Sequence, residues 1–171
     1  MRTRDLTAGA LATALVAATT MVIRIPVPAT QGYINLGETA VYLAALLLGP
    51  VHGLVAGGVG SALADLWGGY AQFAPFTLVI KGVEGWLAGY LFWRVLGGAG
   101  FLQGGWAVRA AVACGAAGAW MVGGYYVAEA FLLGLGPAAA AEVPGNVFQV
   151  LAGVLVALAG ASLLRGVVAP R

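Results

Sequence analysis

Long stretches of this chain carry no charged residue, and this feature limits what the chain can fold into. Eighteen uncharged residues, LTAGALATALVAATTMVI, separate Asp5 from Arg24. Charged residues make up 8% of the chain, whereas a soluble domain carries about 25%. So little charge cannot cover a surface in water, and inside a bilayer a helix satisfies every backbone N–H and C=O group within one segment. The sequence therefore predicts an all-α integral membrane protein.

The uncharged stretches divide into six predicted transmembrane helices, since about 20 residues of helix cross the hydrocarbon core. We expect them at about residues 6–25, 36–48, 51–67, 76–93, 107–134 and 143–165. Gly49 and Pro50 separate the second from the third, because glycine often follows a helix and proline often begins one. The first run could instead be a signal peptide, but IRIPVP, where it ends, shows no cleavage pattern of small residues. Residues 1–171 then form a single transmembrane domain, with no room for a soluble catalytic domain.

The basic residues set the expected orientation, because cytoplasmic loops of membrane proteins carry an excess of lysine and arginine. With six spans and a cytoplasmic N-terminus, these arginines fall inside: Arg2, Arg4, Arg94, Arg109, Arg165 and Arg171. Arg24 and Lys81 lie toward the outside. One helix across residues 39–64 would give five spans and place the last four arginines outside, against the rule. We therefore expect six helices in one bundle, with both termini cytoplasmic, in a multi-pass protein of the cell (plasma) membrane.

The other polar side chains gather toward the predicted outer ends of the helices. Lys81 and Glu84 in TLVIKGVEG are three residues apart and share a helical face, as do Asn146 and Gln149 in VPGNVFQ. The rest of this polar group is Glu38 with Tyr42, Asp65, Tyr125 with Glu129, and Glu142. A charge at mid-bilayer costs at least about 2.5–3.5 kcal/mol, so these faces should turn to the bundle interior or to a cavity. Each pair could simply satisfy itself, but the one-sided gathering favours a small polar ligand that enters from outside.

Several kinds of functional site are not expected. No segment matches G-x-x-x-x-G-K-[ST], so the chain lacks a phosphate-binding loop for ATP. Cys114 is the single cysteine and His52 the single histidine, so we expect neither a metal site nor a cofactor. Ser61 has no histidine at its depth to act as a base, so it is interpreted as a packing residue and the chain as no enzyme. The net charge of +2 gives no reason to expect a nucleic acid partner. The loop residues Tyr33, Tyr70 and Phe73 could stack on an aromatic ligand.

The segments INLGETAVYLAALLLGP, GSALADL and TLVIKG, with the later PGNVFQ, resemble the substrate-binding S component of energy-coupling factor (ECF) vitamin transporters. The resemblance covers nearly the whole chain and is greatest to the subgroup for riboflavin-like, pyridoxine or hydroxymethylpyrimidine substrates. It implies a six-helix membrane protein that binds one vitamin or vitamin precursor from outside. It also implies partners: a transmembrane coupling subunit and two cytoplasmic ATPase subunits, which would drive delivery of the ligand across the lipid bilayer.

The resemblance also implies roles for particular residues. A substrate-binding role is carried onto Lys81, Glu84, Tyr125, Glu129, Asn146 and Gln149, with Asn35 and Glu38 as further candidates. Contact with the coupling subunit is carried onto Ala10, Ala14 and Ala18, which repeat every four residues, although such spacing also arises by chance in an alanine-rich segment. The expected ligand is pyridoxine or a hydroxymethylpyrimidine, and riboflavin next. The alternatives are a stand-alone carrier or channel for a small solute and, with less support, an intramembrane enzyme.

Overall fold

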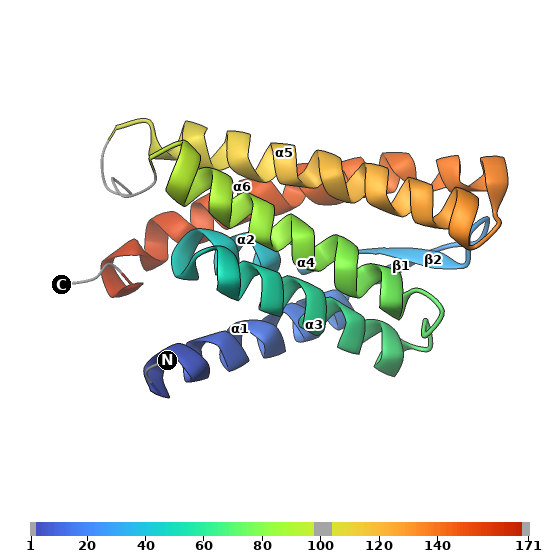
Figure 1. Cartoon of the computed structure of the whole chain (residues 1–171), viewed down its shortest axis with the longest axis horizontal. Helices are drawn as coiled ribbons and strands as arrows, with labels where there is room; N and C mark the ends of the chain where they lie inside the picture. Colours follow the sequence, from blue (N-terminus) through green and yellow to red (C-terminus); the bar gives the residue numbers. More distant parts are fainter. Residues whose placement is uncertain (1–2, 98–103, 169–171) are drawn as a thin grey trace.

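The computed structural model describes residues 3–97 and 104–168, and in these ranges it is a bundle of helices with one small β-hairpin (Figure 1). The helices are α1 (Thr3–Val22), α2 (Gly37–Leu48), α3 (Pro50–Gly68), α4 (Ala74–Tyr90), α5 (Trp106–Val127) and α6 (Val143–Val168). Wider π-helical turns extend α4 as η1 (Leu91–Val95) and α5 as η3 (Ala128–Leu132), and a 3₁₀ turn, η4 (Gly136–Ala141), precedes α6. Of the arginines used to predict the orientation, Arg2, Arg171 and the side chain of Arg165 lie outside what is described.

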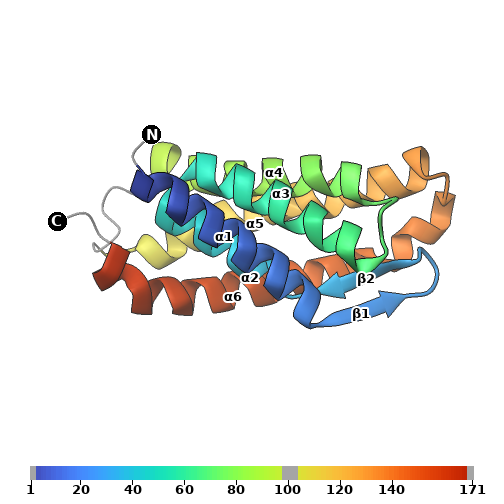
Figure 2. The same ribbon diagram turned by 90° about the horizontal axis from the view of Figure 1, so that it is seen from below.

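The helices run along the long axis of the molecule. Helix α1 begins and α6 ends at one end of the bundle, and the hairpin lies at the other, which we call the hairpin end (Figures 1 and 2). Within the described ranges, three helical segments are long and apolar enough to cross a membrane: Thr3–Val22, Trp106–Leu132 and Gly136–Leu164. Helix α2 is apolar but has 12 residues. The count of six spans and the cytoplasmic placement of both termini remain predictions.

The segment between the first two helices is a hairpin where the sequence predicted a loop. Strand β1 (Arg24–Val27) pairs antiparallel with β2 (Gly32–Asn35), in a register that joins Arg24 to Asn35 and Val27 to Gly32. Pro26 and Pro28 favoured the loop interpretation, because proline cannot donate to a sheet ladder. A two-stranded sheet has only edge strands, so Pro26 is tolerated opposite Tyr33. The hairpin brings Tyr33 and Asn35 over the end of the bundle.

Glycines let α3 and α4 cross with their backbones in contact. A Cβ atom added to Gly85 would overlap the carbonyl oxygen of Gly53, and one added to Gly57 would lie 2.5 Å from the carbonyl oxygen of Lys81. Small residues at such a crossing allow close approach in a bilayer, where packing rather than water exclusion holds helices together. This crossing holds Lys81 and Glu84, which are 4% and 0% exposed, inside the bundle.

The apolar cluster with the most buried residues lies in the half of the bundle away from the hairpin. Tyr42, Leu46, Phe92 and Cys114 are buried there among alanines from α2, α4, α5 and α6. Large apolar side chains instead cover the outside, such as Leu155 and Leu163, which are 69% and 81% exposed. An exterior of this kind suits contact with lipid, and it leaves the hairpin end as the part where polar side chains are buried.

Candidate ligand-binding site

A cavity at the hairpin end gathers polar side chains from most of the fold. Its volume is about 30 Å³, and it is partly open to solvent. Its lining comes from α1, the hairpin and helices α3 to α6 with their connections: Thr20, Gly32, Tyr33, Asn35, Ser61, Asp65, Phe73, Thr77, Lys81, Tyr125, Glu129, Glu142, Asn146 and Gln149. Most of the polar members of this lining are no more than 5% exposed. The cavity is therefore a polar chamber in an otherwise apolar molecule.

The structure brings six of the eight sequence-predicted substrate residues to this one cavity: Asn35, Lys81, Tyr125, Glu129, Asn146 and Gln149. Glu38 and Glu84 do not line it. They lie behind Lys81, where both carboxylates contact its ammonium group. That any of the eight touches a ligand remains a prediction.

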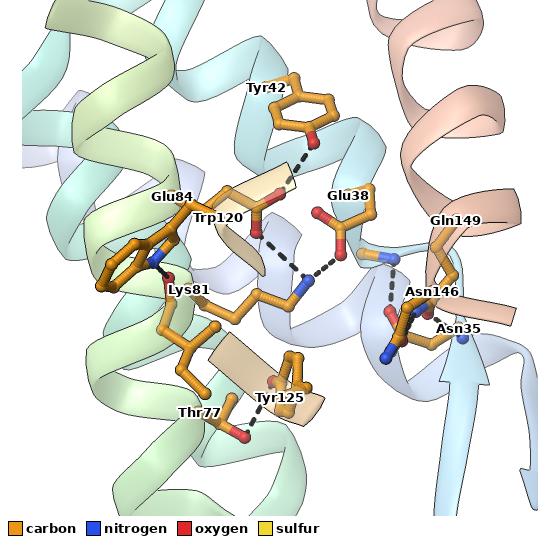
Figure 3. Close-up of polar contacts among 12 residues, drawn as sticks. Asn35, Glu38, Tyr42, Thr77, Lys81, Glu84, Trp120, Tyr125, Asn146 and Gln149 are labelled. Carbon is orange, nitrogen blue, oxygen red and sulfur yellow. Dashed lines mark hydrogen bonds and ion pairs between the residues drawn. The ribbon is translucent and has the colours of Figure 1, made fainter. Parts of the chain in front are cut away.

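Lys81 on α4 contacts two carboxylates, one from α2 and one from its own helix (Figure 3). Its Nζ forms an ion pair with Glu38 and lies 3.4 Å from Oε2 of Glu84. The other oxygen of Glu84 accepts a hydrogen bond of 2.7 Å from the Tyr42 hydroxyl. The spacing in TLVIKGVEG correctly indicated contact between Lys81 and Glu84, but it gave no sign of Glu38 as a second partner, because that contact joins different helices.

Three amide side chains fasten the hairpin to α6 (Figure 3). Gln149 donates a hydrogen bond of 2.8 Å from its side-chain nitrogen to Oδ1 of Asn146, and its oxygen accepts one from the backbone N–H of Asn35. The side chain of Asn35 accepts a bond of 2.7 Å from the backbone N–H of Gly37, at the start of α2. One polar chain thus links β2, α2 and α6 along the cavity wall.

Aromatic rings and hydroxyl groups form another part of the cavity wall. The Tyr33 hydroxyl donates a bond of 2.6 Å to Asp65, and the Tyr33 ring lies 4.4 Å from the Tyr70 ring, centroid to centroid. Burial raises the pKa of Tyr33 above its usual value, and the Asp65 carboxylate raises it further, so this hydroxyl stays a donor. Tyr125 donates to Thr77 at 3.0 Å. Of the three loop aromatics considered from sequence, Tyr33 and Phe73 line the cavity, whereas Tyr70 is not in the lining and packs on Tyr33.

Two glutamates meet where η3 and the start of α6 approach each other. The side chains of Glu129 and Glu142 lie near each other in the cavity lining and are buried, at 1% and 5% exposure. Thr30, in the hairpin turn, donates a hydrogen bond to Glu142. Sequence reasoning placed Glu142 in the outer polar group but not in the site. Its position four residues before Asn146 was the available signal, because the backbone N–H of Asn146 bonds to the carbonyl of Glu142 at 2.8 Å, as in a helical turn.

The predicted coupling residues lie on a different surface. Ala10, Ala14 and Ala18 line an open groove of about 770 Å³ between α1 and α3, with apolar side chains of α3 along the other side. All three alanines are exposed, whereas Val16 and Ala17 turn into the bundle. His52, on α3, contacts the first turn of α1, where its Nε2 lies 3.2 Å from the backbone carbonyl oxygen of Asp5. The groove and the cavity share no lining residue.

Comparisons with known proteins agree with this architecture. Residues 1–165 match the family model described as the ECF-type riboflavin transporter, S component. The chain is 30% identical over 155 residues to the "Thiamine precursor transporter HmpT" of Lactococcus lactis subsp. cremoris (strain MG1363), an alignment that covers 90% of this chain and 83% of that protein. It is 57% identical over 75 residues to an "Uncharacterized protein in gap 3'region" of Pyrococcus woesei, covering 44% of this chain and half of that protein. The chain therefore belongs to the family of ECF-type vitamin transporter S components, which are membrane transport subunits and not enzymes.

Proposed function

We propose that this chain binds one vitamin or vitamin precursor in the hairpin-end cavity, from the outer face of the plasma membrane, and delivers it inward as the S subunit of an ATP-driven ECF importer. The observation that carries the proposal is the cavity itself, whose lining is polar and buried in a molecule with an apolar exterior. In this proposal the six helices span the bilayer, and both termini are cytoplasmic.

Buried polar groups without partners support a bound ligand. The Thr20 hydroxyl and both oxygens of Glu129 have no hydrogen-bond partner among the described residues. Leaving such groups unpaired destabilises a folded protein by about 1–3 kcal/mol each. A polar ligand in the cavity would offset that cost, because both side chains belong to the cavity lining.

The favoured ligand is pyridoxine or a hydroxymethylpyrimidine, and riboflavin is the next candidate. Tyr33, Phe73 and Tyr125 supply rings against which a heteroaromatic ring can pack. Asn146 and Gln149 supply amide groups for its hydroxyls and ring nitrogens. The similarity to the Lactococcus thiamine precursor transporter favours the pyrimidine, and the match to the riboflavin transporter family favours riboflavin.

Delivery across the membrane requires partners in this proposal. The exposed row Ala10, Ala14 and Ala18 offers a flat surface for a helix of the transmembrane coupling subunit, because small residues let helices approach closely. Two cytoplasmic ATPase subunits supply the energy, since the sequence has no phosphate-binding loop of its own.

Two measurements test the proposal. Titration of the detergent-purified chain with pyridoxine, hydroxymethylpyrimidine and riboflavin should show tight binding of one of them at one site per chain. In proteoliposomes, uptake of that ligand should require ATP and the coupling and ATPase subunits. Binding of none of the three would refute the ligand assignment. Accumulation in vesicles that hold this chain alone would identify a stand-alone carrier instead.

A further inference from the structure

The hairpin end carries more carboxylates than cations. Its buried acids are Glu38, Asp65, Glu84, Glu129 and Glu142, and its cations are Lys81 and Arg24. The Lys81 ammonium lies against Glu38 and Glu84. Asp65 accepts a hydrogen bond from Tyr33, and the Arg24 guanidinium lies over the ring of Tyr33, 5.5 Å from its centroid. The two remaining acids, Glu129 and Glu142, form no ion pair with any cation among the described residues.

These two glutamates, the acidic pair, are held together despite their like charge. The backbone carbonyl of Glu129 accepts a bond of 3.0 Å from the N–H of Leu135, and that of Glu142 accepts the bond from Asn146. The Glu142 carboxylate packs against Gly32, where a Cβ atom of any other residue would overlap it. Two adjacent buried carboxylates disfavour each other's charge, so the fold keeps this arrangement at a cost in stability. Such an arrangement is expected where a ligand or a proton supplies the missing positive charge.

The acidic pair faces the cavity with free acceptor capacity. None of the described residues donates a hydrogen bond to either oxygen of Glu129, which is 1% exposed. A separate observation comes from α1, where the Thr20 hydroxyl is 2% exposed, also lines the cavity and has no partner. The ring of Tyr125, one helical turn before Glu129, also lines the cavity. Its centroid is 5.8 Å from the Lys81 ammonium.

We propose that the acidic pair recognises a cationic, amidine-like edge of the ligand, which here means an exocyclic amino group beside a protonatable ring nitrogen. This inference rests on the proposed function and narrows its substrate to a heteroaromatic base. A carboxylate accepts two parallel N–H bonds from such an edge, in the geometry that makes charge-assisted pairs strong. The aromatic rings of the lining favour a flat cation over a flexible one. The same surplus of negative charge rejects phosphorylated forms of the ligand.

A matched set of probes tests the selectivity on the full chain in detergent. The set contains a hydroxymethylpyrimidine with an amino group beside a ring nitrogen, its oxo counterpart with a carbonyl in place of the amino group, and the phosphate ester of the first compound. Pyridoxine and riboflavin complete the set. We expect the aminopyrimidine to bind tightest, and the oxo compound and the phosphate ester to bind weaker by about tenfold or more, which corresponds to roughly 1.4 kcal/mol.

Variants then assign the selectivity to the acidic pair. Glu129→Gln and Glu142→Gln remove one negative charge each with little change of shape. Each should weaken aminopyrimidine binding and shrink the ratio of its affinity to that of the oxo compound by about tenfold. Asp5→Asn, the same change at the far end of the bundle, should alter neither quantity. A purely structural role would weaken all probes equally and leave the ratio unchanged, and that result would overturn the assignment.

The outcomes separate this inference from the proposed function. If pyridoxine or riboflavin binds tightly while the aminopyrimidine does not, the vitamin-binding function stands and the acidic-pair inference is wrong. Equal affinity for the aminopyrimidine and its oxo or phosphorylated counterpart also overturns it. If none of the five compounds binds to folded protein, the proposed ligand class and this inference fail together.

Discussion

Removal of the Lys81 ammonium is the change whose outcome the structure constrains most tightly. Lys81→Met keeps an unbranched side chain of similar length but leaves Glu38 and Glu84 without their shared cation. Breaking a buried ion pair by removing one partner destabilises a protein by about 3–5 kcal/mol. At roughly 2–4 °C per kcal/mol for a chain of this size, the melting temperature should fall by about 6–20 °C.

The two carboxylates do not depend on Lys81 equally. Glu84 keeps the hydrogen bond from Tyr42 after the ammonium is removed, whereas Glu38 has no hydrogen-bond donor for either oxygen among the described residues. Glu38→Gln should therefore restore more of the stability lost in Lys81→Met than Glu84→Gln does. The triple variant should melt near the parent, because replacing a whole buried ion pair by uncharged groups is often neutral.

Thermal unfolding of the five proteins in one detergent, followed by tryptophan fluorescence, measures these differences. The five are the parent, Lys81→Met, Lys81→Met with Glu38→Gln, Lys81→Met with Glu84→Gln, and the triple variant with all three changes. An unchanged melting temperature in Lys81→Met would refute the buried ion-pair arrangement. Equal or greater rescue by Glu84→Gln would show that Glu84, as the helical spacing suggested, is the main partner.

Two other predictions concern surfaces away from Lys81. Ala14→Trp should fill the groove between α1 and α3 and block assembly with the coupling subunit, measured by co-purification. Ligand affinity, measured by titration, should stay within about twofold, because groove and cavity share no residue. Loss of ligand binding with assembly intact would instead show that the alanine row packs inside the protein. Gly85→Ala should destabilise the protein by about 1–3 kcal/mol, since its new methyl group meets the backbone of Gly53. Gly123 is on the exposed side of α5, where an added Cβ atom would have no neighbour within 4 Å, so Gly123→Ala should be neutral or stabilising by up to about 1 kcal/mol. Equal shifts in melting temperature for the two glycine variants would contradict the close crossing of α3 and α4.

The sequence allowed the broad architecture to be predicted because charge and apolar length are properties of local segments. The helical composition and the gathering of polar groups toward one end follow from them. The hairpin was missed because Pro26 and Pro28 signal a loop by local rules, and only the pairing across the turn, with Tyr33 opposite Pro26, makes a strand of that segment.

The candidate site was predictable only where its contacts lie within one helix. The i,i+3 spacing indicates Lys81 with Glu84 and Asn146 with Gln149, and both contacts occur in the structure. Contacts between helices leave no such trace. Thus Glu38 as a partner of Lys81, and Thr20 in the cavity lining, required the fold to be known.

Mass spectrometry of the small molecule that stays bound to the detergent-purified chain tests the central claim most directly. The account predicts one vitamin-sized heteroaromatic molecule per chain in the parent protein. It also predicts loss of that molecule from Asn146→Leu, which removes an amide from the cavity wall, provided that this variant melts at a temperature close to the parent's. Retention of the same molecule in the same amount by the folded variant would contradict binding in the hairpin-end cavity.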